Sequence, residues 1–201
     1  MYPTQRFVDH DNSCLFSSVG YLLDEKFDEQ TKYKYRQLLI NYLESKDIDI
    51  SVLGTTKEDY INKMLNINTW GGGIELKLFS EIFQTKIVSI DIQFNRLDIF
   101  GQDQNYINQI FVLYNGIHYD PIVMATTEDT KDDIKIFDTN DVNTMISFQS
   151  FAKTLKDRNA YVDLSNSLNL KCTSCGTITQ SQDTAAEHGV NYGHWNFEEM
   201  K

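Results

Sequence analysis

Apolar positions change their spacing along this chain, and the change separates a helical first part from a strand-rich middle. Four segments carry apolar residues at helical spacing: one opening at Cys14, one over 29–45, one after Thr55 and one over 74–83. Four later segments are rich in β-branched and aromatic residues, as strands are: 86–92, 96–100, 109–114 and 117–122. This order predicts an α+β fold in which helices pack on a small, mostly antiparallel sheet.

The second half of the chain carries the turn and linker signals. Asn115-Gly116, between the last two predicted strands, indicates a tight type I′ turn, because both central positions of such a turn need φ above zero. Residues 125–146 are acidic and rich in Thr and Asn, and we expect a loop region there with room for a short strand. A helix is expected around 147–158. Ser165-Asn166-Ser167 then reads as a linker, which predicts two domains, 1–164 and 165–201.

Composition and charge narrow the class of protein. The 201 residues are 41% hydrophobic and include 12 Phe and 11 Tyr, enough to build a core. No apolar run approaches the roughly 20 residues that cross a bilayer, and the N-terminus lacks a signal pattern. We therefore expect a cytoplasmic protein, with the nucleus also open, and no membrane partner. A net charge of −11 repels phosphate backbones, so no nucleic-acid partner is expected, although solubility alone also explains the charge.

The three cysteines and four histidines fall into two sets. Cys172-x2-Cys175, twelve further residues, His188, five more and His194 have the spacing of a two-Cys, two-His zinc site. Four protein ligands leave no open position for catalysis, so the zinc is expected to be structural and needed for this short tail to fold. The alternatives are a Cys172–Cys175 disulfide, or an unpaired C-x-x-C with two surface histidines. The finger is acidic, which favours a protein partner over DNA.

Cys14 is the spare thiol, and His118 is its most plausible base. A helix N-terminus stabilises a thiolate, and its N–H groups can bind an oxyanion. On a strand, His118 and Asp120 would share a face, so the carboxylate could orient the imidazole. Taken singly, a buried apolar cysteine and a histidine bonded to a neighbour are the simpler interpretations. His10, beside the spare cysteine, is the one histidine without an expected role.

Three segments occur in the order of the characteristic motifs of the ovarian-tumour-domain (OTU) deubiquitinases, and they resemble those motifs. They are Asp-Asn-Ser-Cys-Leu-Phe at 11–16, Thr-Trp-Gly-Gly-Gly-Ile-Glu-Leu at 69–76 and Tyr-Asn-Gly-Ile-His-Tyr-Asp-Pro at 114–121. The metal module at 170–197 is similar to that of the subgroup that acts with the valosin-containing AAA ATPase in ubiquitin-dependent degradation. The resemblance covers nearly the whole chain. It implies an OTU-type cysteine-protease fold followed by a ββα-like zinc finger.

The resemblance also implies roles for individual residues. Cys14 would attack the carbonyl of the ubiquitin C-terminal glycine, and His118 would activate it and later protonate the departing lysine amine. Asp120 would orient His118, and Asp11 would shape the oxyanion loop. The implied substrate-binding residues are Asn12, Trp70, Gly71, Gly72, Gly73, Ile74, Glu75 and Tyr119. Taken alone, the glycine run before a helix could hold a phosphate, but the Lys-Ser/Thr of a nucleotide-binding loop does not follow it.

The expected activity is that of a thiol isopeptidase that removes ubiquitin from lysine side chains, in ubiquitin-dependent quality control such as ER-associated degradation. No cofactor is expected for the chemistry, and ubiquitin and polyubiquitin chains are the expected partners. The alternative is a catalytically silent ubiquitin-binding adaptor. The valosin-containing ATPase is an expected partner only if the chain can dock on it. Subgroup members dock on it through a preceding ubiquitin-like domain, whereas the catalytic motif here begins at residue 11, as in a naturally short form or a truncation.

Overall fold

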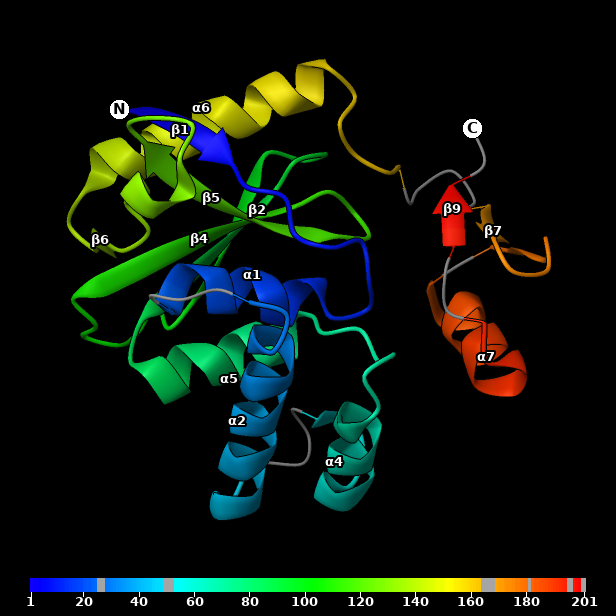
Figure 1. Ribbon diagram of the computed structural model, residues 1–201. Coiled ribbons are helices and arrows are strands. Elements are labelled where there is room, and N and C mark those ends of the chain that lie inside the picture. Colours follow the sequence, from blue (N-terminus) through cyan, green and yellow to red (C-terminus); the bar gives the residue numbers. More distant parts are fainter. Residues whose placement is uncertain (25–27, 49–52, 164–168, 181, 195–196, 200–201) are drawn as a thin grey trace.

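The computed structural model describes residues 1–24, 28–48, 53–163, 169–180, 182–194 and 197–199. In the first unit, helices cover both faces of a central sheet (Figure 1). Its helices are α1 (Cys14–Leu23), α2 (Thr31–Ser45), α4 (Lys57–Leu65), α5 (Gly73–Phe83) and α6 (Val142–Asp157), with a short 3-10 turn η1 (Thr130–Asp132). Its strands are β1 (Tyr2–Gln5), β2 (Lys86–Asp91), β3 (Arg96–Phe100), β4 (Asn108–Tyr114), β5 (Tyr119–Ala125) and β6 (Phe137–Asp138). Among the described helices, none combines the length and the apolar character needed to span a membrane.

The central sheet has the strand order β1-β5-β4-β2-β3, with β6 paired to β4. Every pairing is antiparallel except that of β2 with β4. The exception arises because the chain leaves β3 at one edge and returns on the other side of β2. The prediction of a mostly antiparallel sheet with packed helices is therefore confirmed.

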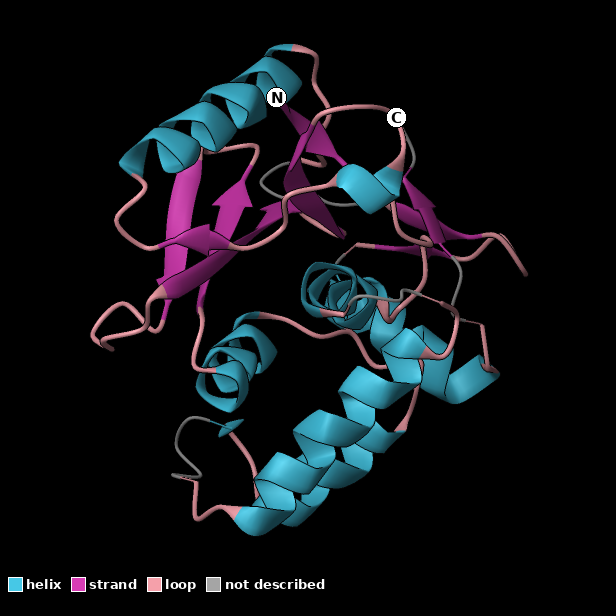
Figure 2. Cartoon of the chain, turned by 60° about the vertical axis from the view of Figure 1, so that its left-hand side comes forward, coloured by secondary structure: helices cyan, strands magenta, loops and turns pink. Residues whose placement is uncertain are grey.

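The two faces of the sheet belong to two apolar cores, as the alternation of side chains along a strand requires. On β4, Ile110 and Val112 pack toward α1, α2 and α5, whereas Phe111 and Leu113 pack toward α6. Phe148 of α6 contacts the edge of Phe111, with the ring centroids 4.9 Å apart. In Figure 2 the long helix α6 lies on one side of the sheet, and α1, α2, α4 and α5 lie on the opposite side. Both cores hold β4 and β5 rigidly, and the loop between these strands carries His118.

Helix α1, which carries Cys14 at its first position, packs closely on α2. At the point of contact the residue of α1 is Gly20, and a Cβ there would lie only 2.3 Å from the Thr31 side chain. Glycine therefore lets the two helices approach. Phe16, Val19 and Leu22 of α1 are almost completely buried. The apolar stripe predicted after Cys14 is thus the stripe that fixes this helix against the sheet.

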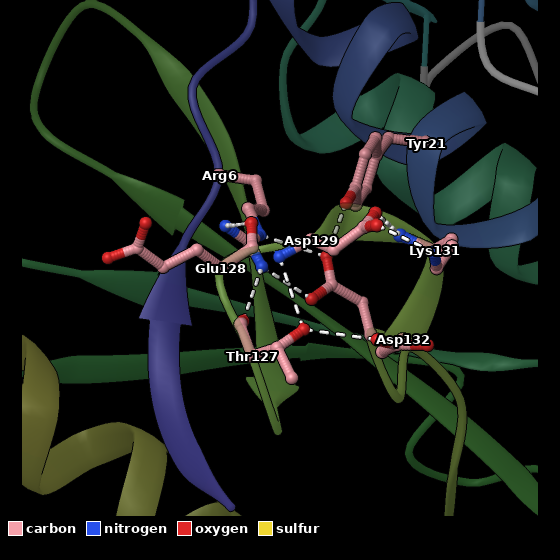
Figure 3. A network of polar contacts seen from close by, with 8 residues as sticks. Arg6, Tyr21, Thr127, Glu128, Asp129, Lys131 and Asp132 are labelled. Atoms are coloured by element: carbon pink, nitrogen blue, oxygen red, sulfur yellow. Dashed lines mark hydrogen bonds and ion pairs between the residues drawn. The ribbon is translucent and has the colours of Figure 1, made fainter.

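Strand β1 is tied to the rest of the domain by a polar network centred on Arg6 (Figure 3). Arg6 forms two short contacts with the buried carboxylate of Asp133, at 2.9 and 2.7 Å, and its guanidinium also donates to the Thr127 and Glu128 carbonyls. The hydroxyl of Tyr21, from α1, donates to the same carboxylate. The network joins β1, α1 and the loop before β6, and so fixes the strand that leads into the Cys14 turn.

The C-terminal unit is a small sheet with one helix, and it lies beside the layers of the first unit (Figure 1). Its strands are β7 (Leu170–Cys172), β8 (Ile178–Thr179) and β9 (Phe197–Glu199), in the order β8-β7-β9, and its helix is α7 (Gln182–Tyr192). Within the part that the structure describes, its buried apolar cluster consists of Val162, Leu170 and Ala185. Ile117 of the first unit and Phe197 pack on this cluster, so the unit is attached next to the loop that carries His118.

Several sequence predictions require correction. The Asn115-Gly116 turn is not a two-residue hairpin: Tyr114 pairs with Tyr119, so four residues form the loop, and His118 lies just before β5 rather than on it. Helix α6, expected around 147–158, begins at Val142, five residues before the expected start. Asp141 caps it there by accepting the Thr144 N–H.

Other differences are smaller additions. The third helix is capped by Thr56, which accepts the Asp59 N–H, one residue later than expected. Strand β1 was not predicted. Strand β6 corresponds to the short strand expected within the loop region 125–146. The finger has a third strand, β9, beyond the expected ββα arrangement, and α7 starts at Gln182. The predicted domain boundary and linker lie outside the described residues.

Candidate active site and metal centre

The Cys14 turn is shaped by Asp11. One oxygen of the Asp11 carboxylate accepts the Ser13 N–H at 2.8 Å, and the Asp11 carbonyl accepts the Cys14 N–H at 3.3 Å. The other carboxylate oxygen forms an ion pair with Lys32 of α2 at 2.7 Å. Cys14 itself is the first residue of α1 and is only 6% exposed. The thiol therefore lies at a helix N-terminus, in a turn that is held on both sides.

The loop between β4 and β5 brings His118 to this thiol. The Asn115 side-chain oxygen accepts the N–H groups of Ile117 and His118, at 3.1 and 2.8 Å, and the Asn115 N–H donates to the His118 carbonyl at 3.1 Å. These bonds shape the loop so that the Tyr119 N–H lies 3.5 Å from Cys14 Sγ and can donate to it. Two segments that are 105 positions apart in the sequence meet here.

His118 connects the thiol with a buried carboxylate. Its Nε2 lies 3.2 Å from Asp120 Oδ1, and each of these residues is 4% exposed. Burial alone would lower the pKa of His118, but hydrogen bonds to Asp120 and Cys14 and the charges of both groups raise it overall. Because Nε2 is engaged by Asp120, Nδ1 is the ring nitrogen left for Cys14. The arrangement favours a charged imidazole beside the nucleophile, as a thiol protease requires.

Asp120 has two further partners that the sequence did not reveal. Gln5 Nε2 donates to Asp120 Oδ2 at 2.8 Å, and the Val8 N–H donates to Oδ1 at 3.1 Å. Both come from the segment that starts with β1, which pairs with β5. A carboxylate whose two oxygens accept from several fixed donors keeps its direction. Gln5 therefore acts as a positioning residue for the orienting carboxylate.

Arg36 of α2 holds the Cys14 turn through buried hydrogen bonds. It is 4% exposed, and Nη2 of its guanidinium donates to Ser13 Oγ at 2.9 Å and to the Asn12 carbonyl at 3.5 Å. The same group binds the carbonyls on the opposite side of the site: Met64, Ile67 and Thr69. Burial lowers the pKa of Arg36 to about 10, so it remains charged at neutral pH. One buried cation thus joins the nucleophile turn to the segment before Trp70.

The glycine-rich segment is held by side chains on both sides. The Trp70 indole N–H donates to the Asn12 side-chain oxygen, which joins two of the predicted substrate-binding residues. Glu75 is 3% exposed; it accepts the Gly72 N–H at 2.6 Å and the Tyr60 hydroxyl. Burial raises the pKa of Glu75, and these hydrogen bonds oppose that shift. Glu75 therefore holds the loop from inside the protein.

The other predicted substrate-binding residues are placed differently. Gly71 packs tightly against α1, since a Cβ would lie 3.1 Å from the Phe16 ring, and Ile74 packs partly on the core. The Tyr119 ring stacks on Tyr114, with the centroids 4.6 Å apart. A pocket opens beside His118, and its lining residues are His10, Asp11, Asn12, Trp70, Ile117, His118, Leu170 and Phe197. Asn12 and Trp70 thus face this pocket, whereas Glu75 and Ile74 turn inward.

The four predicted metal ligands come together in the C-terminal unit. The ligand atoms of Cys172, Cys175, His188 and His194 all lie within 4.8 Å of one another. Tetrahedral zinc, with bonds of about 2.0–2.3 Å, holds its ligands at roughly 3.3–3.8 Å. His194 Nδ1 is buried without a hydrogen-bond partner among the described residues, and the cysteines are free thiols rather than a disulfide. The donor set therefore fits a structural metal such as zinc.

Comparisons with known proteins agree with this geometry. A model of the OTU-like cysteine protease family matches residues 9–127. The chain is 31% identical over 204 residues to the ubiquitin thioesterase OTU1 of Dictyostelium discoideum, covering 100% of this chain and 62% of that protein. Against the human ubiquitin thioesterase OTU1 the identity is 32%, with 98% and 57% covered.

A relative of similar length is also found. The ovarian tumour domain-containing deubiquitinating enzyme 2 of Arabidopsis thaliana is 32% identical, with 98% of this chain and 97% of that protein covered. The chain spans about three fifths of the length of the OTU1 relatives above. A solved OTU domain in complex with ubiquitin has the same fold, with a TM-score of 0.68 at 24% identity over 80% of this chain and 90% of that one.

Proposed function

The chain belongs to the OTU-like cysteine protease family, and from that premise we propose that it is a thiol isopeptidase that cleaves ubiquitin from lysine side chains. The observation that carries the proposal is the convergence of Cys14, His118 and Asp120 within hydrogen-bonding reach at a helix N-terminus. The relatives named as ubiquitin thioesterases and the ubiquitin-bound neighbour support ubiquitin as the substrate. The net charge of −11 is also suited to a basic partner surface.

The first half of the reaction uses the thiolate of Cys14. Its sulfur attacks the carbonyl carbon of the ubiquitin C-terminal glycine and forms a tetrahedral intermediate. His118, held charged by Asp120, then gives its proton to the lysine amine, the carbon–nitrogen bond breaks, and a thioester to Cys14 remains. The fixed donors Gln5 and Val8 keep Asp120 in place throughout.

In the second half, neutral His118 takes a proton from water, and the hydroxide attacks the thioester. The carbon–sulfur bond breaks, and ubiquitin leaves with a free carboxylate while Cys14 returns to its thiolate. The oxyanion forms beside the Ser13 and Cys14 N–H groups, which here bind Asp11. The longer of these two bonds, 3.3 Å from Cys14 N–H, is the weaker and is the one we expect to exchange for the oxyanion.

Zinc is proposed as the metal of the C-terminal unit, held by Cys172, Cys175, His188 and His194. It would supply folding energy to that unit, and catalysis needs no further cofactor. We further propose a cytoplasmic role in ubiquitin-dependent quality control, including ER-associated degradation, with the valosin-containing ATPase as a partner. Co-purification of that ATPase with the tagged chain from cell extract tests this last point.

The primary test compares the zinc-loaded protein with Cys14→Ala. A ubiquitin probe with a C-terminal thiol-reactive electrophile should form a covalent adduct with the unaltered protein alone, and Cys14→Ala should lower the rate of chain cleavage by at least about 10³-fold. Ubiquitin affinity, measured by calorimetry, should survive the substitution. Cleavage that persists in Cys14→Ala contradicts the mechanism. Binding without adduct or cleavage by the unaltered protein would instead identify the silent adaptor.

A further inference from the structure

His10 lies directly against the catalytic histidine. The ring centroids of His10 and His118 are 4.2 Å apart and the rings are inclined by only 16°, so the two imidazoles stack face to face. The other three histidines are used by the active site and the metal centre, and His10 is the one that neither uses. His118 is buried, whereas His10 is exposed and lines the pocket beside it.

The backbone of His10 is fixed to the catalytic residues on both sides. The Asp11 N–H donates to the Asp9 carbonyl at 2.8 Å, which closes a tight turn with His10 at its centre. Before the turn, the Val8 N–H donates to Asp120; after it, Asp11 binds Ser13 and Lys32. The backbone on both sides of His10 is therefore fixed, and this keeps its ring stacked on the ring of His118.

The stack restrains a motion that the other contacts leave open. Asp120 and Cys14 bind His118 through its ring edge, so they resist movement within the ring plane more than tilting out of it. A second ring lying on the face of His118 opposes that tilt and keeps water from that face. Correct alignment of Nδ1 with the sulfur is what makes proton transfer efficient.

We propose that His10 is a positioning residue that holds the plane of the His118 ring for proton exchange with Cys14. The inference rests on the cysteine-protease chemistry proposed above. It requires a flat ring at position 10 and does not require the ring nitrogens of His10. His10→Phe should therefore retain the function, and His10→Ala should lose it.

The test measures two reactions in His10→Ala, His10→Phe and a matched control, Phe7→Ala, which removes another exposed ring from the same segment. One is steady-state cleavage of a fluorogenic ubiquitin substrate. The other is alkylation of Cys14 by iodoacetamide, followed residue by residue by mass spectrometry. For His10→Ala we expect kcat and the alkylation rate to fall about three- to tenfold, with KM little changed. His10→Phe and Phe7→Ala should stay within about twofold of the unaltered protein.

The outcomes separate this inference from the proposed function. If the unaltered protein alkylates rapidly at Cys14 in a ring-dependent way but does not cleave ubiquitin, the substrate proposal fails and the positioning role stands. If it cleaves ubiquitin and His10→Ala matches it in both assays, the positioning role is wrong. If kcat and the alkylation rate fall as much in His10→Phe as in His10→Ala, the role is also overturned, because a flat ring alone would then not suffice. Thermal unfolding of all variants should be unchanged, since His10 is exposed.

Discussion

The catalytic unit and the C-terminal finger hold their functional groups by different means. Cys14, His118 and Asp120 come from a helix, a loop and a strand that two apolar cores fix in place, and Arg36, Gln5 and Asn115 complete the positioning. Among the described residues, the finger has a small buried apolar cluster, made of Leu170 and Ala185 with Val162 of the preceding segment, and a set of four potential metal ligands. Burial therefore preorganises the first site, whereas we expect a bound metal to supply the order of the second.

The two regions nevertheless touch at a sensitive position. The Val162 N–H donates to the Asn115 carbonyl at 2.7 Å, and Ile117 packs on the cluster at the base of the finger. Gly116, between them, has φ of +107°, and a Cβ there would lie 2.6 Å from the Val162 carbonyl oxygen. Loss of the finger should therefore reach catalysis through this loop.

The largest effect is expected when the orienting carboxylate loses its charge. Asp120→Asn should lower kcat by about 10²- to 10⁴-fold, because the imidazolium loses its partner. Asp120 is one of the groups that raise the pKa of His118, so its neutralisation lowers that pKa. His118 is charged below its pKa, and the alkaline limb of the pH–rate profile should therefore move to lower pH. Stopped-flow and steady-state profiles between pH 6 and 10 measure both changes.

Asp98→Asn is the matched control for this variant, because Asp98 lies on β3 and its side chain is 41% exposed. It should leave both kcat and the alkaline limb where they were. An unmoved alkaline limb in Asp120→Asn would mean that Asp120 does not keep His118 charged. Retention of zinc content in both variants would sharpen the contrast, because the finger ligands lie in another unit.

A smaller effect is expected at Arg36, which acts through the backbone of the Cys14 turn. In Arg36, Nη2 donates to Ser13 Oγ and to the Ile67 and Thr69 carbonyls, while Nη1 donates to the Met64 carbonyl. Lysine keeps the charge but has one tetrahedral nitrogen in place of this planar fork, so it cannot occupy both positions. Arg36→Lys should lower kcat about 10- to 100-fold with a smaller change in KM, since the turn and not the substrate-binding surface is displaced. In Arg36→Met, which removes every donor, kcat should fall further.

Arg158→Lys, at the exposed C-terminal end of α6, is the control and should behave as the unaltered protein. Because a buried arginine also contributes to folding, rates must be compared per folded molecule, with circular dichroism as the measure. Equal kcat for folded Arg36→Lys and the unaltered protein would remove Arg36 from the positioning residues.

The sequence predicted those parts whose signal is local. Strands β2, β3 and β4 and helix α5 were found within one residue because their apolar periodicity is regular. Strand β1 was missed because it has four residues, one of them Pro3, and its partner is β5, more than a hundred positions away. The start of α6 was missed because its first turns present Val142 and Ile146 to solvent, without the apolar stripe that marks a packed helix.

The same distinction applies to the site. The spacing of His118 and Asp120 indicated a pair, and the ligand spacing indicated the metal centre, because both signals lie within short segments. Arg36, Gln5 and His10 carried no signal, because their roles come from contacts with residues that folding brings close. Preorganisation of the catalytic unit is thus a tertiary property that composition and spacing do not encode.

The smallest effect on catalysis is expected from loss of the metal. Removing zinc with a strong chelator, or substituting Cys175→Ser, should increase hydrogen exchange throughout α7 and β7, because the small apolar cluster cannot hold them alone. The two cores of the catalytic unit contain none of the ligands, so its unfolding temperature should change little. Cleavage should fall only a few-fold, through loosening of the Asn115–Gly116 contact with Val162. Exchange mass spectrometry, calorimetry and kinetics on the same samples test this together. If chelation abolished cleavage and unfolded the catalytic unit as well, the metal would order both regions, and the division between a site held by burial and a site held by metal would be wrong.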